Sequence, residues 1–343
     1  MKLRRVALIV LSLVFLLGLS SPGMSLAADK PIKWRMATLY PRGIAYEVVY
    51  FNFAENVKKM SNGRLESEVI FDGEGVAATE VLGATRTGLV QVGSPYMALH
   101  AGELPAGLIE LGLPGALTEF LQIRTLFHEG GWIKALRQAY AKHNLYYVAE
   151  WSSPGTYLVT KKPIQTSDDL KELKIRAPGP YGKMLKNLGA APVTMAFSEI
   201  YTSLATGVID GVDGCNIIDH RDGKFYEVAK WMYPLPLTGA QTCPLIVNMD
   251  AWKKLPDDLK EIVTMAARWG GDEWAMKSLV WEKAALKEMM AAGLKMSPMP
   301  SEEDKAKWIA AGRKVWPEYE QKDADCKNLI KIQREFIKKL GLQ

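Results

Sequence analysis

Cysteine is scarce in this chain of 343 residues, and its scarcity excludes a class of small exported proteins. Three cysteines stand far apart, at Cys215, Cys243 and Cys326, with no metal-type spacing between them. An odd number of dispersed cysteines does not predict a disulfide framework. One bridge with one buried thiol remains compatible with an oxidising compartment.

A catalytic constellation is also missing. No glycine loop followed by Lys and Ser or Thr is present to hold a phosphate, and the histidines share no metal spacing: His100, His128, His143 and His220. The most suggestive cluster is Asp219 to Asp222, for which a solvated loop or a helix start is the simpler interpretation. Cys215 lies nearby, but without a paired base an inert buried thiol is favoured over a nucleophile. We therefore predict a binding protein, with no catalytic residues, rather than an enzyme.

An excess of charge of one sign is lacking as well. The formal net charge is +5, and removal of Lys2, Arg4 and Arg5 with a leader segment leaves 5 − 3 = +2. The chain has no basic block and no interleaving of aromatic and basic residues. Nucleic-acid binding is therefore not predicted.

Long apolar runs are absent except for one, from Val6 to Leu19. It follows a basic head, is shorter than the roughly 20 apolar residues of a spanning helix, and leads into small residues up to Ala27. This pattern predicts a signal peptide over residues 1–27 and a mature protein in the periplasm. An uncleaved membrane anchor is the alternative, and no cysteine near the cut site indicates lipid attachment.

The rest of the chain alternates strand and helix patterns, which indicates an α/β protein. Residues 80–90 and 199–209 share one layout, in which a short helix opened by Glu ends at Thr-Gly and passes into an apolar strand. Two lobes of similar construction would produce this echo. Chance similarity of a common helix-to-strand turn is the alternative.

Length suggests two domains of the usual ~100 to 200 residues. We expect lobe I to comprise 28–152 plus 242–281, and lobe II to comprise 153–241 plus 282–343. A helix over about 257–291 is too long for one lobe and would brace both, although Gly270 and Gly271 could also break it.

Arg176 stands at the end of a strand pattern and precedes Ala177-Pro178-Gly179, a turn that leaves room beside its side chain. An arginine there can hold a carboxylate or another flat oxyanion by paired, charge-assisted hydrogen bonds. A surface arginine at a strand end is the alternative.

Four segments carry a family resemblance: Leu170–Arg176, Pro192–Tyr201, Gly207–Gly211 and Lys224–Val228. Together they resemble the solute-binding subunit of tripartite ATP-independent periplasmic (TRAP) transporters, the DctP type, over nearly the whole mature chain. The resemblance implies a two-lobed clamshell with a long bracing helix, in which Arg176 binds the ligand's carboxylate. It also implies docking of the closed form on the small and large membrane subunits of a permease driven by a sodium gradient.

The sequence departs from two branches of that family. Gly214 replaces a ligand-binding asparagine of the sialic-acid branch, and a second arginine of that branch is lost near Thr156. The 2-oxoacid branch has a glutamate at the position of Asp213 that helps to coordinate a cation. Its adjacent tryptophan and glutamine are missing, at about Gly214 and Gly155. The resemblance thus leaves two roles open for Asp213, a cation ligand or a partner for a ligand hydroxyl, and we expect no other cofactor.

Further cleft residues are expected at strand ends and beside these motifs. Phe197 stands at the family's pocket-floor position, although a core aromatic is the alternative. The remaining candidates are Tyr40, Glu74 and Tyr96 in the first lobe, and Trp151 and Asn216 flanking the second. Several aromatics with one arginine would suit a small anion with one acidic group.

The function expected from these residues is reception of a small organic acid for a TRAP-type secondary transporter. A 2-oxo or 2-hydroxy monocarboxylate is the favoured ligand, and a small sulfonate is the competitor because a guanidinium also binds three-oxygen head groups. A binding protein for an ABC importer or a sensor is a further alternative. Monomer is the default oligomeric state, although the long C-terminal helix could pair.

Overall fold

A computed structural model describes residues 30–110, 112–115 and 117–342. The predicted signal peptide over 1–27 lies outside the described residues. None of the described helices combines the length and the apolar composition that a membrane crossing requires. All three cysteines are buried and free, so the bridge left open by the sequence does not form.

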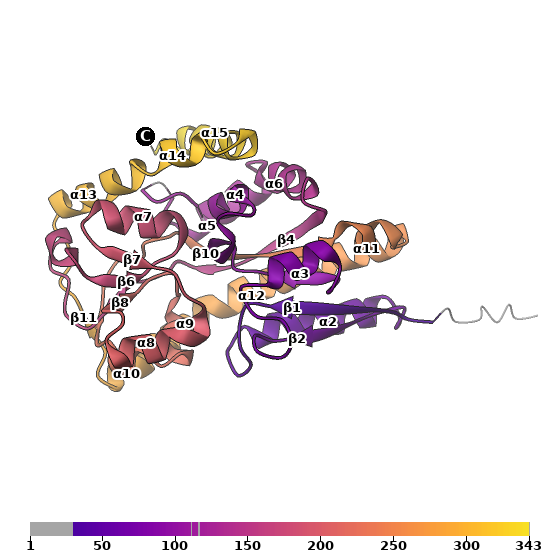
Figure 1. The fold of residues 1–343 in the computed structure, drawn as a ribbon, viewed down its shortest axis with the longest axis horizontal. Coiled ribbons are helices and arrows are strands. Elements are labelled where there is room, and N and C mark those ends of the chain that lie inside the picture. Colours follow the sequence, from indigo (N-terminus) through magenta and orange to yellow (C-terminus); the bar gives the residue numbers. More distant parts are fainter. Residues whose placement is uncertain (1–29, 111, 116, 343) are drawn as a thin grey trace, which may run out of the picture.

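The chain folds into two α/β lobes, each built on one sheet (Figure 1). The sheet of lobe I has the strand order β2 (Leu65–Ile70), β1 (Ile32–Thr38), β3 (Val92–Ser94), β10 (Ala240–Asn248) and β4 (Leu145–Pro154). The sheet of lobe II has the order β11 (Lys295–Met296), β9 (Trp231–Met232), β5 (Val159–Thr160), β8 (Gly211–Val212), β6 (Lys174–Arg176) and β7 (Ala191–Val193).

The two lobes repeat one β-α-β-α-β unit. In lobe I, α2 (Glu47–Met60) and α3 (Val81–Thr87) connect β1, β2 and β3, and β1 lies parallel between the other two strands. In lobe II, α7 (Gly179–Asn187) and α8 (Ile200–Thr206) connect β6, β7 and β8 in the same way. This confirms the echo in the sequence as a structural repeat. The strand after each Thr-Gly ending starts later than predicted, at Val92 and Gly211, because a short turn follows each helix.

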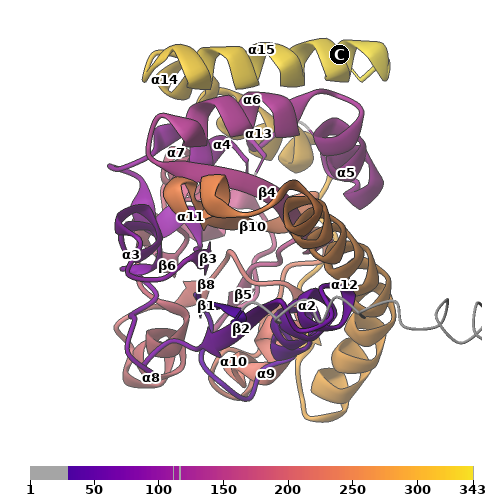
Figure 2. The same ribbon diagram turned by 90° about the vertical axis from the view of Figure 1, so that its right-hand side faces the viewer.

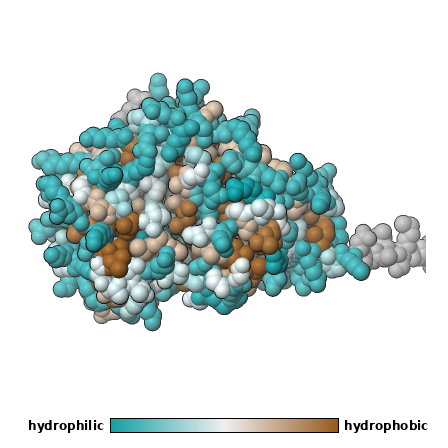
Figure 3. Space-filling model, viewed as in Figure 1, coloured by the Kyte–Doolittle hydropathy of each residue, from teal (hydrophilic) through white to brown (hydrophobic). Residues whose placement is uncertain are grey.

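The remaining helices cover the two sheets. Lobe I carries α4 (Pro105–Ile109), α5 (Phe120–His128), α6 (Trp132–Ala141) and α11 (Met249–Lys254). Lobe II carries α9 (Ile217–Asp222), α10 (Phe225–Val228) and α13 (Glu302–Arg313), which packs on α7. Two further helices, α14 (Trp316–Glu320) and α15 (Ala324–Lys339), complete the chain, and Figure 3 shows a mainly hydrophilic surface over α13 to α15.

Helix α12 (Asp257–Ala291) runs unbroken along both lobes (Figure 2). It packs on β4 and α2 of lobe I and on α9 of lobe II. Gly271 allows the closest approach, since a Cβ there would lie 3.0 Å from both the Glu150 carbonyl oxygen and Trp151 Cδ1. Gly270 and Gly271 therefore allow α12 to pack closely on β4, and they do not break the helix.

The C-terminal tail contacts both lobes. α13 packs on lobe II, whereas α15 packs on α4 and α6 of lobe I. We therefore propose a domain boundary inside 282–343 that assigns α15 to lobe I, which differs from the boundary predicted for this tail. The crossings between lobes are then β4, β10, α12 and the segment before α15.

Candidate ligand-binding site

The interlobe cleft lies at the carboxyl ends of the central strands of both lobes. Two small neighbouring cavities occupy it, each of about 10 Å³, roughly the space of one water molecule. Tyr96, Gly214 and Gln241 line both of them. Strand ends of this kind are where open α/β sheets bind ligands. In the described conformation the lobes are closed over these cavities, neither of which holds more than about one water molecule.

Direct contacts hold the two lobes together beside these cavities. Ser198 Oγ donates to Asp72 Oδ2 at 3.1 Å, and the Ala45 amide donates to Asp222 Oδ2 at 2.7 Å. Each pair joins a loop of lobe I to an element of lobe II. Closure therefore rests partly on a few polar contacts at the cleft edge, which can exchange with water when the lobes open.

Arg176 is the cation of the site. It ends β6, is 2% exposed, and lines one of the cavities. Its Nε and Nη2 donate to the Met195 carbonyl at 3.3 and 3.2 Å, and its Nη1 donates to the Asp213 carbonyl at 3.0 Å. A guanidinium has five N–H groups, so one remains on Nη1 and one on Nη2. These two groups form a fork that can bind both oxygens of a carboxylate.

No carboxylate of the described residues lies within 4.0 Å of the Arg176 guanidinium. The nearest aromatic face is that of Tyr96, whose ring centroid is 5.5 Å from Arg176 Cζ. A buried cation is normally paired with an anion, because burial without a partner costs free energy. The site therefore has the electrostatics of a receptor for a ligand that supplies the anion.

Asp213 follows β8 and is fully buried beside the first cavity. Its Oδ1 accepts a hydrogen bond from Thr156 Oγ1 at 3.0 Å, while Oδ2 has no partner. Burial raises the pKa of Asp213 to about 6, against the opposing effects of the Gly214 amide, Thr156 and Arg176. Its free oxygen can accept from a ligand hydroxyl, or donate to a ligand oxygen when the carboxyl is protonated.

A network of Tyr40, Gln241 and Asp219 forms the rear of the cleft. Gln241 Nε2 donates to Tyr40 Oη at 2.9 Å and to Asp219 Oδ2 at 2.8 Å. Tyr40 Oη also donates to Asp219 Oδ2 at 3.3 Å, and the Tyr40 ring meets Phe197 edge-on at 5.3 Å. Burial raises the pKa of Asp219 to about 7. The network joins lobe I to lobe II in the closed state.

Gly214 lies between the two lobes with φ of 85°. A Cβ at this position would be 2.8 Å from Arg176 Nη1 and 3.0 Å from Tyr96 Oη. Only glycine combines the left-handed backbone with this close approach. Gly214 thus lets the arginine and the tyrosine close over the same point of the cleft.

We expect Gly214→Ala to lower the affinity for the ligand at least tenfold, because its methyl group would hold Tyr96 and Arg176 apart and tenfold corresponds to only about 1.4 kcal/mol. Isothermal titration calorimetry measures the loss. Gly43→Ala is the matched control, since Gly43 has φ of 92° but nothing within 4 Å of the added Cβ. Equal losses of affinity in both variants would show that backbone strain, and not the contact with Arg176, is responsible.

The structure brings seven of the ten predicted cleft residues to the cavities: Arg176, Phe197, Asp213, Gly214, Tyr40, Tyr96 and Thr156. It does not bring Glu74 to them, because Glu74 forms an exposed two-bond ion pair with Arg42 at 2.6 and 2.8 Å. Asn216 does not line the cavities either, since it is buried as the N-cap of α9 and donates to Ser153 Oγ at 2.8 Å.

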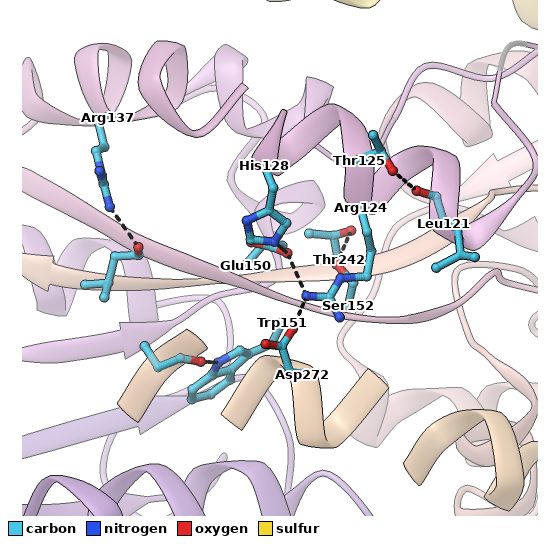
Figure 4. A network of polar contacts seen from close by, with 12 residues as sticks. Leu121, Arg124, Thr125, His128, Arg137, Glu150, Trp151, Ser152, Thr242 and Asp272 are labelled. Atoms are coloured by element: carbon cyan, nitrogen blue, oxygen red, sulfur yellow. Dashed lines mark hydrogen bonds and ion pairs between the residues drawn. The ribbon is translucent and has the colours of Figure 1, made fainter. Parts of the chain in front are cut away.

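Trp151 requires a correction as a predicted cleft residue. Its side chain is fully buried in the core between β4 and α12, where Nε1 donates to the Ala267 carbonyl at 2.9 Å (Figure 4). β4 continues past Trp151 to Pro154, because it pairs with β10 over this length. Trp151 is therefore an interior strand residue and not a residue at a strand end.

Sequence reasoning missed several lining residues: Leu39, Leu99, Pro178, Tyr181, Thr238, Ala240 and Gln241. Two of them stand at sequence positions that could have identified them. Tyr181 follows the turn after Arg176, and Gln241 is the first polar residue after the Thr238-Gly239 return to lobe I. Proximity to the arginine motif and to the hinge could have identified both.

The residues at Asp213 do not by themselves fit a resident cation. Among the described residues no group of three His, Cys, Asp or Glu side chains could hold a metal ion. Asp213 offers one unpartnered oxygen, whereas Ca²⁺ takes 6–8 oxygen ligands. A cation at Asp213 would need most of its ligands from elsewhere, and we derive no step from one.

The cluster at Asp219 to Asp222 forms the C-terminal part of α9, with Asp219 and His220 buried, so it is neither the solvated loop nor the helix start that was expected. In this helix His220 Nε2 contacts the Tyr157 carbonyl at 2.8 Å and burial lowers the pKa of His220 to about 4. Burial raises the pKa of the Cys215 thiol well above its usual value. The Cys215 thiol is therefore protonated at neutral pH, and the thiolate is the form that a nucleophile requires.

Comparison with known proteins places this geometry in context. The family model "Bacterial extracellular solute-binding protein, family 7" (DctP) matches residues 41–323. A protein of Nostoc sp. described as a monocarboxylate 2-oxoacid-binding periplasmic protein is 27% identical over 322 residues, covering 90% of this chain and 85% of its own.

Two solved structures share the fold. A TRAP periplasmic solute-binding protein of Pseudoalteromonas atlantica with bound sodium and pyruvate superposes with a TM-score of 0.83 at 23% identity, covering 91% of this chain and 95% of its own. One from Colwellia psychrerythraea with bound calcium and pyruvate has a TM-score of 0.84 at 22% identity, covering 91% and 96%. Both are TRAP receptors, so the clamshell prediction is confirmed.

Proposed function

Because this chain belongs to bacterial extracellular solute-binding protein family 7, the DctP family, we propose that it is the receptor of a TRAP-type transporter for a small organic acid anion. The observation that carries this is Arg176, a buried cation with two free N–H groups and no carboxylate partner among the described residues. In this proposal the ligand's carboxylate occupies the fork, and closure removes water and strengthens the pair.

The favoured ligand is a 2-oxo or 2-hydroxy monocarboxylate. The cleft offers one cation, one free Asp213 oxygen beside Thr156, and aromatic walls from Tyr40 and Phe197. The Nostoc relative is described as binding 2-oxoacids, and the two solved relatives hold pyruvate. A small sulfonate is the second candidate, since the Arg176 fork also fits two oxygens of a three-oxygen head group.

A thermal-shift screen of the mature protein against 2-oxo, 2-hydroxy and dicarboxylic acids and small sulfonates tests the proposal. A ligand at ~100 times its Kd should stabilise the fold by roughly 2.7 kcal/mol, which is measurable as a rise in Tm. Hits confined to monocarboxylates would support the favoured class. A response to none of these acids would contradict the proposed ligand chemistry.

The pH dependence of binding separates the two roles left open for Asp213. Its carboxyl is neutral below a pKa of about 6 and negative above it. A bound anion nearby favours the neutral form of Asp213, so binding raises the pKa of this carboxyl. Wild-type affinity should therefore be highest below pH 6 and fall as pH rises through 6. The total fall should be about tenfold for each unit by which binding raises the pKa of Asp213. Calorimetric titration at pH 5 and pH 7.5 measures the change.

Asp213→Asn is the matched variant, because it keeps the shape and removes the charge. Its affinity should be nearly independent of pH over this range. The opposite result would be a wild-type affinity for the acid that rises with pH and is lost in Asp213→Asn or in the presence of a chelator. That result would indicate a cation shared between Asp213 and the ligand.

Delivery to a membrane permease completes the proposed function. The family implies permease partners, and we propose small and large TRAP subunits that take the ligand from the closed receptor and use a sodium gradient. Uptake of labelled ligand by vesicles that contain these subunits should require both the receptor and the gradient. Uptake that instead depends on ATP would favour the alternative of an ABC importer.

A further inference from the structure

The outer face of α12 carries a regular stripe of nine exposed residues, which we call the α12 stripe. Successive members are three or four positions apart, so they lie on one face of the helix. All are exposed: Asp258, Glu261, Met265, Trp269, Asp272, Met276, Val280, Lys283 and Lys287. Figure 2 shows α12 along an outer edge of the molecule, so this face is accessible to a partner.

The middle of the stripe is apolar and well exposed. Met265 is 54% exposed, Trp269 59%, Met276 57% and Val280 67%. At about 200 Å² for a large side chain, these four leave roughly 450 Å² of apolar surface in water, in two pairs on either side of Asp272. The opposite face of α12 already packs on β4, α2 and α9, so the fold does not need this second apolar face.

Charge is ordered along the stripe, with acids toward the N-terminal end and lysines toward the C-terminal end. The helix dipole favours acids in the first turn, but it accounts neither for Lys283, two turns before the helix end, nor for the apolar middle. When the stripe is read in the opposite direction, the two lysines fall where the acids Asp258 and Glu261 stand, and the acids fall where the lysines stand. The stripe is therefore complementary to an antiparallel copy of itself.

We propose that a second copy of this chain docks on the α12 stripe, with the two α12 helices antiparallel about a two-fold axis at Asp272. In that register Trp269 faces Met276 of the partner subunit, Met265 faces Val280 of the partner subunit, and Glu261 faces Lys283 of the partner subunit. Such an isologous interface is self-complementary, as two-fold symmetry requires. A stable interface buries ~800 Å² per partner, and the apolar middle of the stripe would supply roughly 450 Å² of it.

The centre of the proposed interface would bring two Asp272 side chains together. Each is already neutralised within its own chain, because Arg124 Nη2 contacts Asp272 Oδ1 at 2.5 Å (Figure 4). At the ends, Asp258 contacts Arg64 of its own chain, whereas neither Glu261 nor Lys283 has an ion-pair partner within 4.0 Å among the described residues. Glu261 and Lys283 are therefore the charges free to pair between copies.

Light scattering coupled to size-exclusion chromatography tests the proposal on the mature chain. The wild type should have the mass of a dimer, and Trp269→Glu should raise the dimer's Kd by about 30-fold or more, as for an aromatic anchor at an interface. Leu89→Glu, at an exposed apolar side chain that follows α3, is the matched control and should remain dimeric, because α3 lies on the side of the molecule away from α12 (Figure 2). A wild-type chain that is monomeric at ~100 µM would overturn the proposal.

Charge reversal tests the antiparallel register. Glu261→Lys and Lys283→Glu should each raise the Kd about tenfold, because each variant faces like charge at both ends. An equimolar mixture of the two variants should recover wild-type affinity. The antiparallel arrangement would be overturned if the mixture failed to recover wild-type affinity. It would also be overturned if Met265→Cys chains cross-linked to each other rather than to Val280→Cys chains. Ligand affinity in all variants should equal that of the wild type, which shows that each is folded.

Discussion

Arg176→Ala should abolish measurable binding of the acid, with a loss of affinity of at least about 100-fold. Each charge-assisted hydrogen bond contributes roughly 1.5–3 kcal/mol, and the fork supplies two to the ligand's carboxylate. Arg176→Lys should restore little of the loss, because an ammonium group cannot reproduce the planar pair of donors. Calorimetric titration with the best acid from the screen measures both variants.

The control for this variant is an arginine with similar bonds and no role in the cleft. Arg137 on α6 donates from Nε to the Tyr147 carbonyl at 3.0 Å and from Nη2 to the Val148 carbonyl at 3.2 Å (Figure 4). Arg137→Ala should lower stability without changing the affinity of the folded protein. Wild-type affinity in Arg176→Ala would remove Arg176 as the anchor and with it the central argument for an acid receptor.

Trp151→Ala should lower the free energy of unfolding by about 3–5 kcal/mol, the usual cost of removing a large aromatic side chain from a core. The ring is fully buried and packs against Tyr50 and Phe53 of α2 at centroid distances of 5.5 and 5.8 Å. Its loss also leaves the Ala267 carbonyl on α12 without its donor. Urea denaturation of the ligand-free protein measures the change.

Trp151→Phe separates packing from the hydrogen bond, and it should be less destabilised than Trp151→Ala. Both variants should bind the acid with wild-type affinity under conditions where they are folded, because the ring faces α12 and not the cleft. A large loss of affinity with little loss of stability would instead support the role that the sequence predicted for Trp151 as a wall of the site.

The features that could be predicted from the sequence are those that local pattern specifies. Arg176 was found because a strand pattern ends at a Pro-Gly turn, and this ending places the side chain at the sheet edge. The repeated unit was found because its helices end alike, at Gly88 and Gly207, each with φ of 80°. The bounds of α12 follow from helical spacing between two prolines, Pro256 and Pro298.

The errors arose where a partner strand, and not the local sequence, decides the outcome. Trp151 was expected to flank the second lobe, but pairing with β10 carries β4 on to Pro154 and places the Trp151 ring in the core. Glu74 follows a strand end, as expected, yet both of its carboxylate oxygens are bound by Arg42 and it does not line the cavities. A strand end indicates a location but does not say which way each side chain points.

By itself, the sequence determined the family, the two-lobed α/β plan and the arginine at the carboxyl end of β6, because these depend on residue types at short, fixed spacings. Only the tertiary structure decided which groups stand beside that arginine. Gln241 reaches Tyr40 across 201 positions of the chain, and burial in the folded chain raises the pKa of Asp213. Burial and long-range contact depend on how the two lobes meet, and no local pattern records that arrangement.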